Sequence, residues 1–313
     1  MSLERAALPT HKRGALASAL AAGRKLRAIE AHSGLSALVA GRAAVGEGPD
    51  RREFDAFWIS SLTSSASKGI PDVELHGLDR RLDTIAEIAL VTDKPLIVDG
   101  DTGGEPVQFE YTCRKLEQLG VSAVIIEDKC WPKRNSLSAD ANHVLAAPEG
   151  FADKIRRGRA ARLGEDLLVF ARLESLIAGL GVDDALLRAR IYLDAGADGL
   201  MIHSRDRAPD PIFAFLDGYA ELCSELGYRR PVVCVPTAYD GVTSTELFAR
   251  GADIAIYANH LLRSAVSAMQ STCQALLAHD RGREASAAIT PVAELLEIVG
   301  YKAALERDRT SQL

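Results

Sequence analysis

The chain contains 313 residues, 47% of them hydrophobic and 26% charged, which is typical of a folded globular protein and argues against a low-complexity chain. Its formal net charge of −6 at pH 7 argues against nucleic-acid or anionic-membrane partners, and no apolar run approaches the roughly 18 residues of a membrane span. Five scattered cysteines without a CxxC pair, and an N-terminus without the apolar core of a signal peptide, predict a cytoplasmic protein with reduced thiols.

Short apolar segments alternate with longer segments of helical period along most of the chain, which is the pattern of repeated βα units with parallel strands. In chain order, strands are predicted at 26–30, 56–60, 95–99, 122–126, 167–171, 199–202, 232–235 and 254–257. Eight such strands indicate an α/β fold, a closed (β/α)8 barrel of the TIM type, rather than an open sheet. Because no linker or change in composition interrupts them, we predict a single domain over 1–313.

Two regions exceed what a simple barrel needs. Residues 128–154 are predicted to form a long polar loop after the fourth strand, and a helical pattern continues beyond about residue 259. The extra helical segment could cap the barrel or pack on another subunit. Three helices are expected to end at Gly120, Gly196 and Gly251, in the left-handed conformation that glycine adopts readily.

Acidic residues follow two neighbouring predicted strands at the point where each strand ends. The third strand ends in Asp99-Gly100-Asp101, whose two carboxylates point to the same side, and the fourth ends in Glu127-Asp128. Barrel enzymes build their sites at this end, and clustered carboxylates repel each other unless a cation neutralises them. An oxygen-only set favours Mg²⁺, with Mn²⁺ as a possible substitute, over zinc. Helix capping or solvated loop acids are the alternative interpretation.

Two further strand ends carry groups that bind anions. The fifth strand ends with Arg172 and Glu174, and the sixth with His203, Ser204 and Arg205. Arginine suits bidentate binding of a carboxylate or phosphate, whereas a lone histidine is as often structural as functional. The sequence contains no P-loop, no GxGxxG after a strand and no GxSxG elbow. This inventory favours a small, doubly anionic substrate such as a phosphorylated or phosphono 2-oxo acid.

Two loops complete the predicted site. The segment SSLTSSASKGIPD after the second strand offers hydroxyl and N–H groups that could hold a carboxylate, beside Trp58 and ahead of Asp72. The alternative is a flexible surface loop. After the fourth strand, EDKCWPKRNSL joins cations to a proline, an amide and a hydroxyl. Such a loop could close over an anionic ligand and exclude water, although an exposed basic loop would have the same composition.

These motifs, in one order, resemble those of the phosphoenolpyruvate mutase / isocitrate lyase superfamily, and of its phosphoenolpyruvate mutases in particular. The resemblance covers most of the chain and is carried by EAHSGLSALVA, FWISSLTSSASKGIPD, DGDTGG, EDKCWPKRNS, ARLESLI, IHSR, PTAYDG and YANH. It implies a Mg²⁺-dependent isomerase that interconverts phosphoenolpyruvate and phosphonopyruvate by intramolecular phosphoryl transfer. This forms the P–C bond in the first step of phosphonate biosynthesis.

The resemblance also implies a role for each matching residue. The metal site would consist of Asp99, Asp101 and Glu127, partly through water, with Asp72 close by. The catalytic residues would be Asp72, Asn135, Arg172 and His203, and the substrate-binding residues Trp58, Ser60, Ser61, Lys133 and Ser136. We expect Asp72 to orient the substrate electrostatically rather than to attack it. Lys133, Asn135 and Ser136 would lie on a loop that gates the site.

Related activities differ at one loop position. The C–C lyases of the superfamily carry a K-[KR]-C-G-H motif there, whereas this chain reads Lys133-Arg134-Asn135-Ser136-Leu137 and lacks the thiol. Phosphonopyruvate hydrolases, which give pyruvate and phosphate, carry threonine in place of the loop asparagine. Position 135 therefore favours the mutase over the hydrolase, and both over a lyase. A non-catalytic metal- or carboxylate-binding barrel is a further alternative.

Two motifs depart from the family pattern. W-G-S-G-L reads WISSL at 58–62 and D-T-G-Y-G reads DTGGE at 101–105, so the pocket wall could differ. Members of the family exchange a C-terminal helix between subunits. We therefore expect a homodimer or homotetramer, joined through the helical segment from about residue 259.

Overall fold

Eight parallel strands close into a barrel in the computed structural model, which describes residues 7–138 and 142–310. The strands follow one another around the barrel in the order β1-β10-β9-β8-β7-β6-β5-β4. Their bounds are β1 Leu26–Glu30, β4 Ala56–Ile59, β5 Leu96–Asp99, β6 Ala123–Glu127, β7 Leu168–Leu173, β8 Gly199–Ile202, β9 Val232–Cys234 and β10 Ile254–Tyr257. All eight predicted strands are confirmed, each within two residues of its expected ends.

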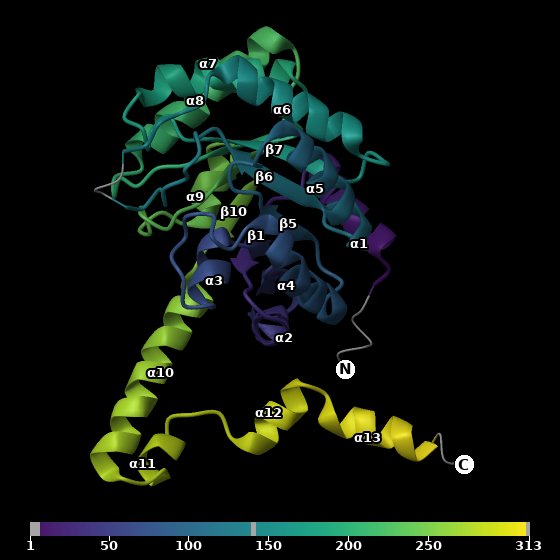
Figure 1. The fold of residues 1–313 in the computed structure, drawn as a ribbon, viewed down its shortest axis with the longest axis vertical. Coiled ribbons are helices and arrows are strands. Elements are labelled where there is room, and N and C mark those ends of the chain that lie inside the picture. The colour runs from purple at the N-terminus through teal and green to yellow at the C-terminus, as the bar shows by residue number, and fades with distance from the viewer. Residues whose placement is uncertain (1–6, 139–141, 311–313) are drawn as a thin grey trace.

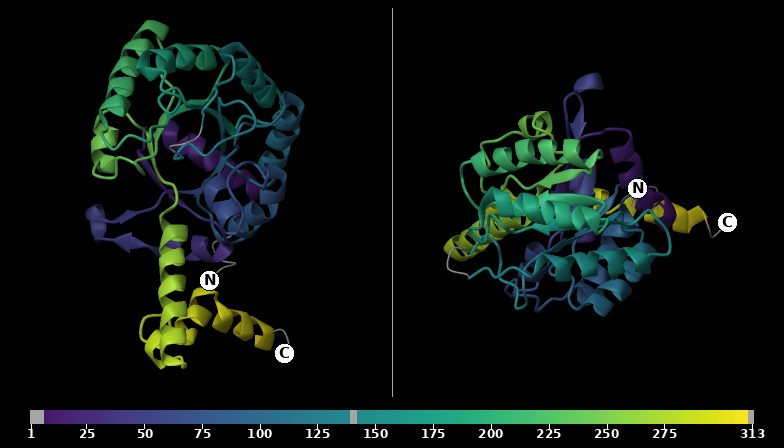
Figure 2. Two further views of the ribbon diagram at one scale, coloured as in Figure 1. Left: turned by 60° about the vertical axis from the view of Figure 1, so that its left-hand side comes forward. Right: turned by 90° about the horizontal axis from the view of Figure 1, so that it is seen from above.

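Helices follow the strands and cover the outside of the barrel (Figure 2). They are α2 Gly34–Arg42, α3 Ser61–Ala66, α4 Leu78–Val91, α5 Pro106–Gln118, α6 Pro148–Ala161, α7 Gly181–Asp194, α8 Asp210–Leu226 and α9 Ser244–Ala249. A small antiparallel hairpin, β2 Ala44–Val45 and β3 Arg52–Glu53, encloses the 3-10 turn Gly48–Asp50. The predicted helix ends are confirmed, because Gly120, Gly196 and Gly251 have φ of 78°, 93° and 104°.

The barrel interior is filled with apolar side chains up to the carboxyl ends of the strands. Trp58, Ile97, Phe170 and Met201 belong to one buried cluster inside the barrel. Helix α1 (Pro9–Ala21) adds Leu16 to this cluster, beside the first residues of β1 and β10, and so closes the amino-terminal end. A second, larger cluster packs the strands against the helices. Only the carboxyl ends of the strands are therefore open to a ligand.

Two predicted loops contain more regular structure than expected. The serine-rich segment after β4 forms the short helix α3, in which Ser60 Oγ accepts a hydrogen bond from Thr63 N at 3.4 Å, and most of its residues are buried. The predicted loop 128–154 ends earlier, because α6 begins at Pro148, a residue that suits a first helical position. A bridge between Lys129 and Leu145 pairs the two ends of this loop.

The C-terminal segment leaves the barrel, as the helical pattern beyond residue 259 predicted. Helix α10 (His260–His279) projects outward and is followed by α11 Arg283–Ser286, α12 Val292–Ile298 and α13 Tyr301–Thr310 (Figure 1). No residue of α10 is buried, and Leu277 is 85% exposed. Within the described residues, no helix combines the length and the apolar character needed to cross a bilayer.

Candidate active site

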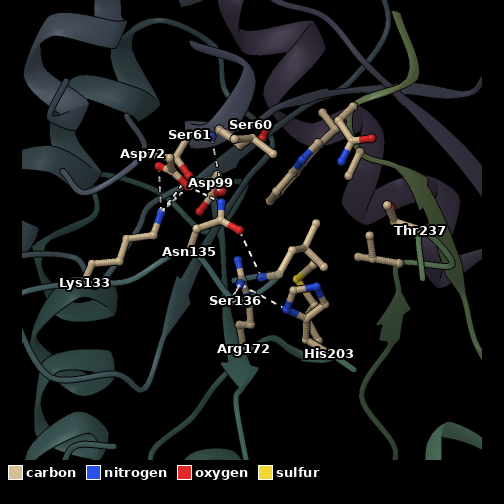
Figure 3. Close-up of a pocket in the computed structure, with 17 residues that line it drawn as sticks. Ser60, Ser61, Asp72, Asp99, Lys133, Asn135, Ser136, Arg172, His203 and Thr237 are labelled. Carbon is tan, nitrogen blue, oxygen red and sulfur yellow. Dashed lines mark hydrogen bonds and ion pairs between the residues drawn. The ribbon is translucent and has the colours of Figure 1, made fainter. Parts of the chain in front are cut away.

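A small polar cavity lies at the carboxyl ends of the strands (Figure 3). Its volume of about 50 Å³ is room for only a few water molecules. Ten of the twelve predicted site residues line it, namely Trp58, Ser60, Ser61, Asp72, Asp99, Lys133, Asn135, Ser136, Arg172 and His203. The other two, Asp101 and Glu127, are buried beside it. The fold therefore brings together residues that lie as far apart as 145 positions in the sequence.

The end of β5 is held close to β6 by a glycine. A Cβ on Gly100 would lie 2.7 Å from Ile126 Cγ2, so a larger residue would push the two strand ends apart. Asp99 and Asp101 flank this glycine, and Asp101 has a left-handed φ of 53°. Asp99 Oδ2 accepts hydrogen bonds from Ser61 N at 3.2 Å and from Ser61 Oγ at 2.9 Å. The close strand contact and the serine donors together fix the first carboxylate.

Positive charges keep the Asp99 carboxyl ionised. Burial alone would raise its pKa, but the nearby charges of Lys133, Arg172 and Arg81 outweigh burial and hold the pKa well below its usual range. Lys133 Nζ also forms an ion pair with Asp101 and lies 3.1 Å from Asp72 Oδ1. The single charge of the loop lysine thus interacts with all three carboxylates, Asp72, Asp99 and Asp101.

Sequence reasoning missed Arg81, which contacts the end of β5 and does not line the cavity. This residue of α4 is fully buried, donates to the Asp99 carbonyl at 2.6 Å and forms an ion pair with Asp101. The signal was an arginine on an apolar helix face, because Arg81 shares the buried side of α4 with Ile85 and Ile88. An arginine on that face needs a buried anion as partner, and the strand-end acids supply it.

Glu127 is the acid most in need of a cation. It is 1% exposed, and neither side-chain oxygen accepts a hydrogen bond, although Arg172 Nη2 lies 3.0 Å from Oε2. Burial raises the pKa of Glu127 to about 7. An unsatisfied buried carboxylate beside two further acids suits a hard divalent cation with oxygen ligands.

The carboxylates themselves are not arranged as a metal cluster. Within residues 7–138 and 142–310, no group of three Asp, Glu, His or Cys side chains is placed to hold a metal ion. The Lys133 ammonium lies among the acids instead, where it donates to Ser61 Oγ at 2.8 Å. The donor chemistry therefore fits Mg²⁺, and the assignment of Asp99, Asp101 and Glu127 as its ligands stays a prediction.

The loop after β6 reaches across the cavity to Asp72. Asn135 Nδ2 donates to Asp72 Oδ2 at 2.7 Å, while Asn135 Oδ1 accepts from Leu137 N at 3.0 Å. Figure 3 shows Asp72, Lys133 and Asn135 on one side of the cavity, with Arg172 and His203 on another. The predicted loop residues therefore turn inward over the site rather than outward into solvent.

A second charged cluster joins the ends of β7 and β8. Arg172 Nε forms an ion pair with Glu174, and Arg172 Nη2 donates to Ser136 Oγ at 2.6 Å. Burial alone would raise the pKa of Glu174, but Arg172 and His203 hold it well below its usual range. Burial, followed by the Arg172 charge, lowers the pKa of His203. At neutral pH the cluster presents a fixed guanidinium and a neutral imidazole to the cavity.

Two lining residues from the last strands also escaped the sequence analysis. Thr237, after β9, and Asn259, after β10, line the cavity away from the charged clusters. Thr237 Oγ1 is buried without a hydrogen-bond partner. The available signal was their place in PTAYDG and YANH, two motifs that follow strand ends.

Comparisons with known proteins bear on this site. A family model described as phosphoenolpyruvate phosphomutase matches residues 16–277. The phosphonopyruvate hydrolase of Variovorax sp. (strain Pal2) is 38% identical over 292 residues, covering 92% of this chain and 95% of that protein. A crystal structure of phosphoenolpyruvate phosphomutase from Streptomyces platensis subsp. rosaceus has a TM-score of 0.87 at 32% identity, covering 96% of this chain and 99% of that one. Phosphonopyruvate hydrolase in complex with oxalate and Mg²⁺ has a TM-score of 0.82 at 35% identity, covering 94% of this chain and 97% of the other.

Proposed function

Because the chain belongs to the phosphoenolpyruvate phosphomutase family, we propose that it interconverts phosphoenolpyruvate and phosphonopyruvate. In this reaction the bond between phosphorus and the enol oxygen breaks and a bond between phosphorus and C3 forms. The phosphoryl group stays within the molecule, and no proton is gained or lost overall. The site therefore needs to hold a moving anion and to exclude water, more than it needs a covalent nucleophile.

The contact between Asn135 and Asp72 is the observation that carries the proposal. Asn135 Nδ2 donates to Asp72 Oδ2 at 2.7 Å and lines the cavity, where the amide can offer an N–H group to an oxygen of the phosphoryl group. An amide is a poor nucleophile and a poor base, so it can guide a phosphoryl group without capturing it or activating water. The C–C lyases of the superfamily carry a thiol at this position, which this chain lacks.

The other residues are proposed to bind different parts of the substrate. The N–H and O–H groups of Ser60 and Ser61 can bind the carboxylate, with Trp58 as the apolar wall. Arg172 and His203 can hold the phosphoryl group, whose loose transition state is stabilised by fixed positive charge and hydrogen-bond donors. When bound by Asp99, Asp101 and Glu127, Mg²⁺ would supply positive charge for the negative charge that develops on the pyruvate oxygens.

Exclusion of water follows from the size of the cavity and the position of the loop. Lys133 and Ser136 are 2% and 3% exposed, and with Asn135 they cover a space that holds only a few water molecules. A phosphorylated three-carbon acid would enter when the loop opens, since Lys133, Asn135 and Ser136 line the space that it would occupy. Closure afterwards protects the transferring group from hydrolysis.

The second candidate activity is hydrolysis of phosphonopyruvate to pyruvate and phosphate. The 38% identity to a phosphonopyruvate hydrolase supports it, beside the 33–35% identity to phosphoenolpyruvate phosphomutases. Both activities would use the same three acids, Asp99, Asp101 and Glu127, together with Arg172 and His203. They differ in whether the loop lets water reach the phosphoryl group.

One assay tests the proposal. The protein is incubated with phosphonopyruvate and Mg²⁺, and the phosphorus-containing products are followed by ³¹P NMR. Phosphoenolpyruvate as the main product is the expected result. Free phosphate together with pyruvate would instead establish the hydrolase. Cleavage of a 2-hydroxy di- or tricarboxylate, without turnover of phosphonopyruvate, would overturn both proposals.

The raised pKa of Glu127 predicts that Mg²⁺ binding depends on pH. With a pKa of about 7, this carboxyl is mostly protonated at pH 6 and mostly ionised at pH 8. Since Mg²⁺ binds only the ionised form, we expect its dissociation constant to be about tenfold larger at pH 6 than at pH 8. Isothermal titration calorimetry at the two values of pH measures this. Glu127→Gln is the control, because its weaker binding should no longer change over this range, and equal affinity of the unaltered protein at both would contradict the prediction.

We also propose that the C-terminal helices join subunits into a homodimer or homotetramer. Met269 and Leu277 on α10 and Val292 and Leu305 further along are between 42% and 85% exposed, more apolar surface than isolated helices usually leave in water. Measurement of the solution mass by light scattering tests this, and a monomer would contradict it.

A further inference from the structure

Lys129, two residues beyond Glu127, is a buried cation for which the proposed reaction has no role. Its side chain is 2% exposed, and its ammonium does not belong to the residues that line the cavity. Nζ donates to Ser136 Oγ and to the Arg134 carbonyl at 3.1 Å, lies 2.8 Å from Glu174 Oε2, and forms a longer ion pair, at 3.9 Å, with Glu127 Oε1. An ammonium has three N–H donors, and the three nearer acceptors use all of them. Lys129 therefore has no donor left for a substrate.

Two of those acceptors flank the residue on which the proposed function depends. Arg134 and Ser136 stand immediately before and after Asn135, so Lys129 holds the chain on both sides of it. The side chain of Asn135 points the other way, toward Asp72. Lys129, which does not line the cavity, thus holds residues 134 and 136, while Asn135 faces the cavity.

The rest of the loop is anchored at its base. Cys130 N donates to the Val144 carbonyl at 2.8 Å, and Ala146 N donates to the Asp128 carbonyl at 2.8 Å, so the two ends are paired. Pairing at the base does not determine where the tip of the loop lies. Lys129 and Ser136 link the tip to Glu174 at the end of β7, and Lys133 and Asn135 link it to Asp72.

We propose that Lys129 is a positioning residue that latches the loop shut and thereby sets the place of Asn135 over the cavity. For its effect on the reaction the inference rests on the proposed function, because the latch would decide how much of the phosphoryl group is lost to water. The position of the loop itself is independent of which reaction is catalysed. The two parts can therefore be tested separately.

A purely structural role, as the counter-charge of Glu174, predicts a different result. Arg172 and His203 also lie within ion-pair distance of Glu174, both at Oε1, whereas Lys129 lies at Oε2. Removal of Lys129 therefore leaves this carboxylate paired at Oε1, while the loop loses the two contacts that Lys129 makes on either side of Asn135 and keeps those of Ser136 with Glu174 and Arg172. If only the charge matters, the variant loses stability but keeps the loop closed.

The experiment compares Lys129→Met with the unaltered protein and with Lys154→Met. Methionine keeps the length of the side chain but has no charge and no donor. Lys154 is the matched control, since it is also partly buried and donates to a main-chain carbonyl, that of Thr102, at 2.7 Å. Brief trypsin treatment of the folded proteins measures the rate of cleavage after Lys133 and Arg134. Because cleavage follows the open population, we expect the rate to rise about tenfold in Lys129→Met and to stay unchanged in Lys154→Met.

A second readout follows the products by ³¹P NMR. At a Mg²⁺ concentration that saturates both proteins, the share of phosphonopyruvate that ends as free phosphate should be about tenfold larger in Lys129→Met than in the unaltered protein. Lys129→Arg, which keeps the charge and the donors, should show little of this rise. Unchanged cleavage together with an unchanged product ratio would overturn the latch. If the unaltered protein forms no phosphoenolpyruvate, the proposed function fails, while the cleavage rates still decide on the latch. Should Lys129→Met not fold, Lys129→Gln, which keeps two N–H donors but no charge, is expected to give an intermediate cleavage rate, and a rate equal to that of the unaltered protein would contradict the proposal.

Discussion

Replacing Asn135 with alanine should lower the rate of phosphoenolpyruvate formation by about 10²–10³-fold, the usual effect of removing one preorganised donor at a reacting oxygen. Asn135 Nδ2 lies 2.7 Å from Asp72 and is the loop's neutral donor into the cavity. The substitution removes no charge and does not touch Asp99, Asp101 or Glu127. We therefore expect Mg²⁺ affinity to remain within about twofold, since ligand binding depends on charge and ligand count.

Steady-state kinetics and calorimetry on the same preparation check both halves of this prediction. Arg134→Ala is the matched control, because this exposed neighbour makes its side-chain hydrogen bond to the Lys133 carbonyl, at 3.2 Å, rather than to the cavity. Asn135→Thr extends the test, since threonine offers a hydroxyl that can orient water. Its product mixture should shift toward pyruvate and phosphate. Equal losses of turnover and Mg²⁺ affinity in Asn135→Ala would remove the loop from the reaction.

Replacing Arg172 with methionine should combine a loss of turnover of about 10³-fold with a loss of stability of about 3–5 kcal/mol. Arg172 is 7% exposed and pairs with Glu127 at 3.0 Å and with Glu174. Methionine fills similar space, but it leaves two buried carboxylates without their guanidinium. It also removes the positive charge that we assign to the phosphoryl group.

The stability loss should depend on pH in a defined direction. In the unaltered protein the pKa of Glu174 is well below its usual range, mainly because Arg172 outweighs the effect of burial. Such a group stabilises the fold above the pKa of its unfolded form and loses that contribution as pH falls. The difference in unfolding free energy between the two proteins should thus be largest near pH 7 and shrink below about pH 4.5. Denaturant titrations at several values of pH measure it, and a difference that grows toward low pH would contradict this account.

Arg188→Met separates stability from catalysis. Arg188 is a second buried arginine, paired with Asp128 at 3.1 Å and hydrogen-bonded to Tyr192, on α7 and away from the cavity lining. Its loss should destabilise the fold by a comparable amount and reduce turnover far less. Similar kinetic losses in both variants would mean that Arg172 acts only through the fold.

The sequence alone was sufficient for the barrel and for the edge at which the site lies. Strands such as Leu96–Asp99 are short, apolar and followed by polar residues, and their periodicity is a local property of the chain. The site residues then follow from one rule, because parallel strands in a barrel present all their carboxyl ends at the same face. For this reason ten of the twelve predicted residues line one cavity, although nothing in the sequence places Ser60 and His203 in the same cavity.

Only the tertiary structure decided which partners these residues have. Arg81 meets Asp101 because of how α4 is rotated against the barrel, and Lys133 meets Asp72 because the loop folds back across 61 positions. Composition predicted a basic loop, but it could not distinguish the roles of its lysines. Lys133 faces the acids, whereas Lys129 contacts the loop itself at residues 134 and 136. Periodicity follows from near neighbours along the chain, whereas charge pairing depends on contacts between distant segments. The sequence therefore determined the edge that carries the acids, and the packing of loop and helix decided what each charge does there.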